Sequence, residues 1–288
     1  MSDQHHSRQI LTITCPDTVG IVAAVSGFLT DNDAFITEAA QYGDAFSRRF
    51  FMRIVFSLGP LAPSPAELAK KFSSVAHRFQ MIWQLNDGNR KARLLIAVSK
   101  IGHCLNHLMH RHQSGMLPVE IAAIVSNHQD MRALADWHGI PYHYLPVTKE
   151  TKAEQETKLL TLVDHLGIDL VVLARYMQVL SNGTCEALKG RCINIHHSFL
   201  PSFKGAKPYH QAHIRGVKII GATAHYVTGD LDEGPIIDQA VERVDHTHGP
   251  DDMVAIGSDL ESVVLARAVR YHVEHRVLLN GTRTVVFR

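Results

Sequence analysis

The chain has 288 residues and a net charge of +1, with 45% hydrophobic and 20% charged residues. This composition is typical of a soluble globular protein and permits one large domain or two of ordinary size. A charge so close to zero gives no electrostatic argument for binding nucleic acid or a membrane surface, and the longest apolar runs are far too short to span a bilayer.

The cysteine pattern and the N-terminus both indicate a cytoplasmic protein. The four cysteines lie at positions 15, 104, 185 and 192, and no two have the C-x-x-C spacing of a zinc ribbon or a redox pair. They are expected to be reduced thiols. Residues 1–8 are polar and are followed by no apolar segment of the kind found in a secretory signal.

The first part of the chain predicts six elements in the order strand, helix, strand, strand, helix, strand. The strands are expected at residues 8–14, 34–42, 50–56 and 81–85, with helices from about 21 to 30 and from 67 to 79. This order is that of a ferredoxin-like βαββαβ unit. A polar, turn-prone stretch at 86–91 follows, so we predict a first domain over residues 1–88 and a second over 89–288.

The second part predicts strands alternating with helices, which is typical of a Rossmann-like, mostly parallel sheet covered on both faces. The strands are expected at 93–98, 119–125, 169–174 and 191–195, with helices at 102–112, 130–138 and 152–166. After Pro208 the pattern changes to two strands, 217–227 and 235–244, which predicts a mixed edge of the sheet. A long helix from Pro250 to about Val277 and a strand at 284–287 complete the chain.

Polar side chains gather where predicted strands end. Asn194 and His196 are two residues apart on one strand and therefore point to the same side. Asp232 lies in a loop, and a third segment, 173–181, follows another strand; ligands bind at such carboxyl ends. No serine or cysteine is placed as a nucleophile, and Ser198 lacks the G-x-S-x-G turn. A carboxylate, an imidazole and an amide favour acyl chemistry with an external nucleophile.

These segments resemble the folate-dependent formyltransferase family. The resemblance lies in residues 194–205 (NIHHSFLPSFKG), 221–227 (GATAHYV) and 231–237 (LDEGPII), and residues 173–181 resemble the loop that wraps the pterin. It implies that Asn194, His196 and Asp232 are catalytic. It also implies a folate site, no prosthetic group and no metal. The expected substrate-binding residues are Met177, Gln178, Val179, Leu180 and His197.

Residues 8–86 resemble an ACT domain, a small-ligand regulatory module. The resemblance implies a regulatory ligand at the turn formed by Asp17 and Gly20, with glycine or methionine as effector. It also implies a homo-oligomer, with a tetramer favoured. An ACT domain before a formyltransferase-like domain resembles the arrangement of the deformylases that hydrolyse 10-formyltetrahydrofolate and supply formate for purine synthesis.

Two features favour water over an amine as the nucleophile. His197 stands where the transferases of the family have proline. The loop Ser99–Cys104 contains a single glycine, whereas the ribonucleotide transferases use a glycine-rich loop to bind the phosphate of their acceptor. A formyltransferase acting on an amine acceptor, such as glycinamide ribonucleotide, remains the first alternative. A non-catalytic amino-acid sensor that binds folate is the second.

The same residues also permit plainer interpretations. Asp232 is of a type that forms turns, Asn194 could cap its strand, and His225 could be a hydrogen-bonded core histidine. Met177, Val179 and Leu180 could be ordinary core residues, and the Asp17–Gly20 turn could simply start a helix. His196, His197 and Asp232 are also possible zinc ligands, an interpretation that the metal-free family disfavours.

Overall fold

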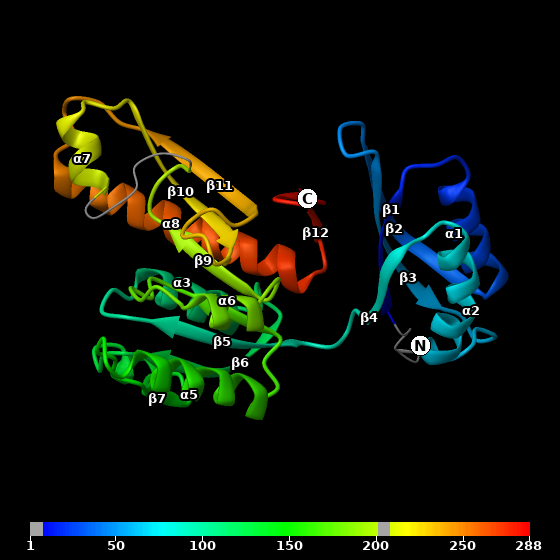
Figure 1. Ribbon diagram of the computed structural model, residues 1–288, viewed down its shortest axis with the longest axis horizontal. Helices are drawn as coiled ribbons and strands as arrows, with labels where there is room; N and C mark the ends of the chain where they lie inside the picture. Colours follow the sequence, from blue (N-terminus) through cyan, green and yellow to red (C-terminus); the bar gives the residue numbers. More distant parts are fainter. Residues whose placement is uncertain (1–7, 201–207) are drawn as a thin grey trace. The chain divides into compact units, whose positions relative to one another are not determined.

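The computed structural model describes residues 8–200 and 208–288, which belong to two compact units (Figure 1). One unit is formed by the chain up to Arg90 together with Glu274–Arg288, and the other by Lys91–Val273. Residues 201–205 of the motif discussed above lie outside the described residues, as does most of the polar N-terminus.

The first unit contains the six predicted elements in the predicted order. They are β1 (Arg8–Pro16), α1 (Ile21–Asp31), β2 (Ala34–Asp44), β3 (Arg49–Leu58), α2 (Pro65–Arg78) and β4 (Ile82–Asp87). The strands form a sheet in the order β2-β3-β1-β4, with all neighbours antiparallel. The two strands that follow the helices, β2 and β4, thus form its two edges.

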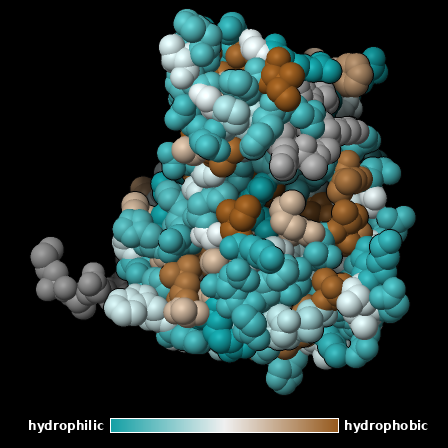
Figure 2. Space-filling view, turned by 90° about the vertical axis from the view of Figure 1, so that its left-hand side faces the viewer, coloured by the Kyte–Doolittle hydropathy of each residue, from teal (hydrophilic) through white to brown (hydrophobic). Residues whose placement is uncertain are grey.

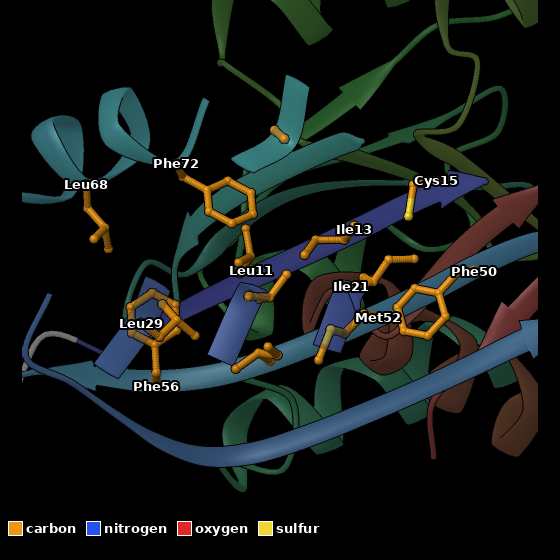
Figure 3. Close-up of a cluster of buried hydrophobic side chains, with 13 residues drawn as sticks. Leu11, Ile13, Cys15, Ile21, Leu29, Phe50, Met52, Phe56, Leu68 and Phe72 are labelled. Carbon is orange, nitrogen blue, oxygen red and sulfur yellow. The ribbon is translucent and has the colours of Figure 1, made fainter. Parts of the chain in front are cut away.

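The core of this unit lies between the sheet and its two helices (Figure 3). Strand side chains alternate, so Leu11, Ile13 and Cys15 of β1 share one face and are buried against α1 and α2. Phe72 of α2 packs edge-on against Trp83 of β4, with ring centroids 4.9 Å apart. The helix itself begins with a capping box between Ser64 and Glu67, an arrangement that satisfies otherwise unpaired N–H groups.

The C-terminal residues correct one prediction. The sequence assigned all of 89–288 to the second domain and extended the long helix to about Val277. That helix ends at Val273, and the following hairpin, β12 (Val277–Asn280) and β13 (Arg283–Val286), belongs to the first unit. Asn280 Nδ2 and Arg283 Nη2 both donate to Asp44 Oδ2, at 2.8 and 2.9 Å. These partners are more than 230 residues apart in sequence, so no local pattern predicts the contact.

The second unit is built on a seven-stranded sheet in the order β11-β10-β9-β8-β5-β6-β7. Its strands are β5 (Ala92–Val98), β6 (Val119–Ser126), β7 (Tyr142–Tyr144), β8 (Leu170–Leu173), β9 (Cys192–His196), β10 (Ile219–Tyr226) and β11 (Ile236–Arg243). The pairs from β7 to β9 are parallel and those from β9 to β11 antiparallel. The predicted parallel sheet with a mixed edge is confirmed, whereas the three-residue β7 was not predicted.

The helices of this unit are α3 (His103–Gln113), α4 (Arg132–Trp137), α5 (Lys152–His165), α6 (Asn182–Ala187), α7 (Pro208–Ile214) and α8 (Pro250–Val273). The long helix α8 packs along β10 and β11 and against α3 (Figure 1). The chain proceeds from β5 to β6 and β7 on one side, and later to β8 and β9 on the other. The strand order therefore reverses between β5 and β8, where ligands bind in open α/β sheets.

No helix among the residues with described structure is long and apolar enough to cross a bilayer. The face shown in Figure 2 is mostly hydrophilic, and its hydrophobic residues lie in small separate groups. Scattered apolar residues of this kind are normal for a protein surface.

We predict that Asp44→Ala loosens the C-terminal hairpin, because its carboxylate accepts from both Asn280 and Arg283. Hydrogen bonds from Ser47 and Asn280 lower the pKa of Asp44 to about 2. The anchor is therefore present above the ordinary carboxyl pKa and is lost as the pH falls toward 2. Amide exchange over residues 277–286 at neutral pH should accelerate severalfold in Asp44→Ala and stay unchanged in Asp31→Ala, an exposed carboxylate on α1. Equal protection in both variants would show that Asp44 is not the anchor.

Candidate active site

A cavity of about 640 Å³ opens in the second unit beside the carboxyl ends of β8 and β9. Its lining divides into an apolar part, which includes Leu173, Leu180 and Val227, and a polar part. The polar residues come from strands, loops and helices far apart in sequence: His103, Arg175, Asn194, His196, His197, Tyr209, His225, Asp232 and Glu261. The three residues expected to be catalytic therefore line one cavity.

Strand β9 places Asn194 and His196 on the same side, as strand alternation predicts. The antiparallel neighbour β10 sets His225 directly opposite Asn194, and Asn194 Nδ2 lies 3.3 Å from His225 Nε2. His225 Nδ1 is 2.9 Å from the Tyr226 carbonyl oxygen, which can only accept. The proton of a neutral His225 therefore lies on Nδ1, and its Nε2 accepts from the amide of Asn194.

Asp232 reaches this strand end from the loop between β10 and β11. Its Oδ2 lies 3.3 Å from His196 Nδ1 and its Oδ1 3.7 Å from His225 Nε2. Hydrogen bonding with His196 is the main effect that outweighs burial and holds the pKa of the Asp232 carboxyl well below its usual range. A carboxylate can only accept, so His196 presents a protonated Nδ1 to Asp232. Its Nε2, buried and without a partner, is then free to act as a base.

The backbone of this loop is tightly constrained. Asp232 has a φ of +58°, a conformation that Asp tolerates better than most residues. Two residues later, a Cβ on Gly234 would lie only 1.7 Å from the carbonyl oxygen of Tyr226. Only glycine permits the loop to pass this close to the end of β10, and this approach brings Asp232 to His196.

The segment expected to bind the pterin forms the apolar wall. Met177, Gln178, Val179 and Leu180 all line the cavity, and Met177 and Val179 are each 57% exposed. Buried side chains outside the loop fix both of its ends. The backbone N–H of Met177 donates to Ser99 Oγ at 2.9 Å, and that of Ser181 donates to Glu156 Oε1 at 2.9 Å.

His197 lies beside His196, with the two rings stacked at a centroid distance of 5.0 Å. It lines the same cavity, and its Nδ1 is 2.5 Å from Arg175 Nη1. Asp17 and Gly20 belong instead to the first unit. Gly20, with a φ of +95°, precedes α1, and Val19 beside it is fully exposed.

The metal alternative finds little support in the geometry. Among the described residues, one group of three possible ligands lies close together, and it is His103, Cys104 and Glu261. Burial raises the pKa of the Cys104 thiol far above neutrality, and the Arg175 guanidinium lies 3.4 Å from Glu261. Both disfavour a cation there. His196, His197 and Asp232, which were considered as zinc ligands, form no such group.

Several residues of the site escaped the sequence analysis. Arg175, His103, Tyr209 and Glu261 come from four separate segments and line the cavity together. Arg175 lies inside the predicted loop 173–181, but nothing in the sequence gave its side chain a role. Glu261 is a charged residue in the middle of α8 that is 1% exposed. A charged residue among the apolar positions of that helix was the available signal.

Comparisons with known proteins place this site in a family. The model of the formyl transferase family matches residues 92–269. A protein of Corynebacterium sp. (strain P-1) named formyltetrahydrofolate deformylase is 54% identical over the whole of both chains. One of the same name from Bacillus subtilis is 46% identical over 99% of this chain and 95% of its own.

Solved structures of deformylases and transferases differ in how much of this chain they match. The crystal structure of a formyltetrahydrofolate deformylase from Burkholderia mallei is 51% identical, with a TM-score of 0.93 over 98% of this chain and 100% of its own. A glycinamide ribonucleotide transformylase from Symbiobacterium toebii is 28% identical, with a TM-score of 0.65 over 69% of this chain and 95% of its own. The transferase thus resembles only part of the chain, whereas the deformylase resembles nearly all of it.

We predict that Gly234→Ala destabilises the fold, because its Cβ would overlap the Tyr226 carbonyl. Overpacking of this kind costs about 1–3 kcal/mol in free energy of unfolding. Gly183→Ala is the matched control, since nothing lies within 4 Å of a Cβ at that position in α6. Urea unfolding should show the loss in Gly234→Ala alone; equal stability of the two variants would contradict the close approach.

Proposed function

The chain belongs to the formyltetrahydrofolate deformylase family, and we propose that it hydrolyses 10-formyltetrahydrofolate to formate and tetrahydrofolate with Asn194, His196 and Asp232 as catalytic residues. These roles rest on one observation: the three side chains line the same cavity, with Asp232 in contact with His196. The formate released is a one-carbon unit available to purine synthesis, and the buried free thiols fit a cytoplasmic enzyme.

The first step is the attack of water on the formyl carbon. Asp232 holds His196 with its proton on Nδ1, so Nε2 of His196 takes the proton from water as the new C–O bond forms. The product is a tetrahedral intermediate with a negative oxygen. One N–H of the Asn194 amide faces His225, which leaves the second N–H for this oxygen, together with protonated His196.

The second step breaks the bond between the formyl carbon and the folate nitrogen. His196 returns its proton to that nitrogen, directly or through water, and tetrahydrofolate and formic acid leave. The formic acid then gives its proton to water and becomes formate. Asp232 stays ionised throughout, because its pKa lies far below that of a free carboxyl. Its charge stabilises the imidazolium formed between the two steps.

The apolar wall gives the folate its place. Met177, Gln178, Val179 and Leu180 would contact the pterin, with backbone groups of the loop reading its polar edge. The anchors Ser99 and Glu156 keep this loop in position. Preorganised loops of this kind reduce the entropy lost on binding.

Water rather than an amine is the proposed nucleophile for two reasons. The loop Ser99–Cys104 after β5 has one glycine and so does not resemble a phosphate-binding loop. The similarity to deformylases extends over nearly the whole chain, whereas that to the transferase covers 69% of it. A purely folate-binding sensor would have no use for a base, a carboxylate and an amide donor on one cavity.

We further propose that the first unit is an ACT-type regulatory module that binds glycine or methionine near Asp17 and Gly20. The element order and the sheet order β2-β3-β1-β4 support this assignment. The first turn of α1 has no side-chain cap, so its N–H groups are available to the carboxylate of an amino acid.

Assembly into a homo-oligomer, with a tetramer favoured, is part of the same proposal. Strand β2 lies at one edge of the first sheet, and its Phe35 and Tyr42 are exposed. An open edge strand with exposed aromatic residues suits pairing with a second copy.

We predict that Asp232→Asn lowers kcat for formate release by about 10²- to 10⁴-fold, the usual contribution of acid–base catalysis. The variant should still bind folate and show an unchanged circular dichroism spectrum. Asp230→Asn, at an exposed aspartate two residues away, is the control and should keep the wild-type rate. Near-normal turnover by Asp232→Asn would contradict the catalytic role.

The regulatory proposal predicts that glycine or methionine changes the rate of formate release by the wild-type protein. Asp17→Ala should still release formate but lose this response, and Asp31→Ala on the same unit should retain it. An undiminished response in Asp17→Ala would remove the assigned binding turn.

A further inference from the structure

A buried polar cluster lies beside the catalytic residues and has no part in the steps above. At its centre is Glu261 of α8, which is 1% exposed. His103 Nε2 lies 2.8 Å from Glu261 Oε2, and the hydroxyl of Tyr209 donates to Oε1 at 2.9 Å. The third partner is Arg175, whose Nε is 3.4 Å from Oε2.

The cluster keeps Glu261 ionised. Burial by itself would raise the pKa of this carboxyl, but the hydrogen bond with His103 and the charge of Arg175 bring it below its usual range. A buried carboxylate costs several kcal/mol unless it is well paired. Its partners are therefore held firmly, and Arg175 is the partner that reaches the catalytic strand.

Arg175 has an unusual backbone. Its φ is +63°, a left-handed conformation that a non-glycine residue adopts at a cost and that clusters at functional sites. Backbone hydrogen bonds on both sides fix this turn: the N–H of Ala174 donates to Ala97, and that of Ser99 donates to Arg175. The turn directs Nη1 to within 2.5 Å of Nδ1 of His197.

This contact decides where His197 carries its proton. A guanidinium has donors only, so Nδ1 of His197 must accept, and the proton of the neutral ring lies on Nε2. Burial, then the charges of Arg175 and His196, lower the pKa of His197 to about 4. His197 is therefore uncharged at neutral pH, and its Nε2 has no partner.

His196 is held in the opposite state. Its Nδ1 faces the carboxylate of Asp232, so the proton of its neutral ring lies on Nδ1 and Nε2 is bare. The two rings are stacked with an angle of 18° between their planes. Two neighbouring imidazoles are thus fixed in different tautomers by partners of opposite charge.

We propose that Arg175, held by Glu261, is a positioning residue of the hydrolysis, because it fixes the proton of neutral His197 on Nε2 and so makes His196, and not His197, the base beside the substrate. This inference rests on the proposed function. In this state His197 can only donate a hydrogen bond from the cavity wall, to the attacking water or to the oxygen of the tetrahedral intermediate. The proton removed from water therefore goes to His196, where Asp232 stabilises it.

The charges around His197 explain why Arg175 is needed. His197 is surrounded by Arg175, His196, Glu261 and Asp232, and the Tyr209 ring packs beside it at 6.3 Å. The two carboxylates favour protonation of His197, and the guanidinium opposes it. Without Arg175, protonation of His197 would become easier, and a charged ring stacked on His196 would make His196 a weaker base.

The test compares Arg175→Met with Arg175→Lys. In Arg175→Met we expect kcat to fall about 10- to 100-fold. This is the usual loss when a side chain that orients a metal-bound histidine is removed, and Arg175 orients His197 in the same way without a metal. The pKa of His197 should rise from about 4 but stay below the ordinary histidine value, because burial still lowers it, and the acidic limb of kcat/KM should move to higher pH. Arg175→Lys keeps a cationic donor and should recover part of both losses.

The matched control is Arg267→Met, which removes another arginine–carboxylate pair at α8. Arg267 Nε donates to the buried Asp238 at 2.6 Å, away from the cavity lining. This variant should lose stability but keep the wild-type kcat and pH profile. A loss of rate in Arg175→Met that merely reflects a weakened fold would appear equally in Arg267→Met and would overturn the proposal.

A measurement on the wild-type protein separates this inference from the proposed function. Nitrogen-15 NMR of histidine-labelled protein reports the tautomer of each ring, with the His197 signals assigned by their loss in His197→Gln. We expect the His197 proton on Nε2 at pH 7, whether or not the protein releases formate. A proton on Nδ1, or a charged His197, would overturn the positioning role, whereas absent formate release would overturn the proposed function alone.

Discussion

The contact between Asp232 and His196 is the interaction on which the proposed chemistry depends. An imidazole at the end of a buried strand can carry its proton on either nitrogen. The carboxylate 3.3 Å from Nδ1 removes this freedom and leaves Nε2 as the basic atom. It also compensates the positive charge that His196 acquires in the reaction, so one ion pair provides both orientation and charge stabilisation.

The mixed sheet makes this contact possible. β10 runs antiparallel to β9 and β11 antiparallel to β10. The loop between β10 and β11 therefore lies beside β9 and carries Asp232 to within 3.3 Å of His196, and Gly234 lets this loop pass close to β10. The same pairing sets His225 opposite Asn194, so the edge supplies Asp232, His225 and the orientation of Asn194 together.

Sequence reasoning succeeded where function depends on short local patterns. Asn194 and His196 are two positions apart on a buried strand and therefore had to share one face of the sheet. The turn that contains Asp232 lies between two predicted strands and therefore had to lie near an edge of the sheet. The resemblance to formyltransferases joined these segments and predicted a formyltransferase-like domain over residues 89–288, and the family model matches residues 92–269. The assignment of the catalytic roles stays a prediction.

What sequence reasoning missed depends on contacts between distant segments. The role proposed for Glu261 depends on His103, Tyr209 and Arg175, which surround it, and nothing in the local sequence of α8 indicates those partners. The C-terminal hairpin was assigned to the wrong domain for the same reason, since its hydrogen bonds to Asp44 join residues more than 230 positions apart in the sequence. The strand β7 has three residues, too few for an alternating pattern to be recognised.

The central claim is that water, and not an amine, receives the formyl group. The most direct measurement follows formate and tetrahydrofolate produced from 10-formyltetrahydrofolate by the purified full-length protein, with and without glycinamide ribonucleotide. We predict equal amounts of formate and tetrahydrofolate without the acceptor, and no increase in tetrahydrofolate when the acceptor is added. Tetrahydrofolate that forms only in the presence of the acceptor, without release of formate, would contradict the account.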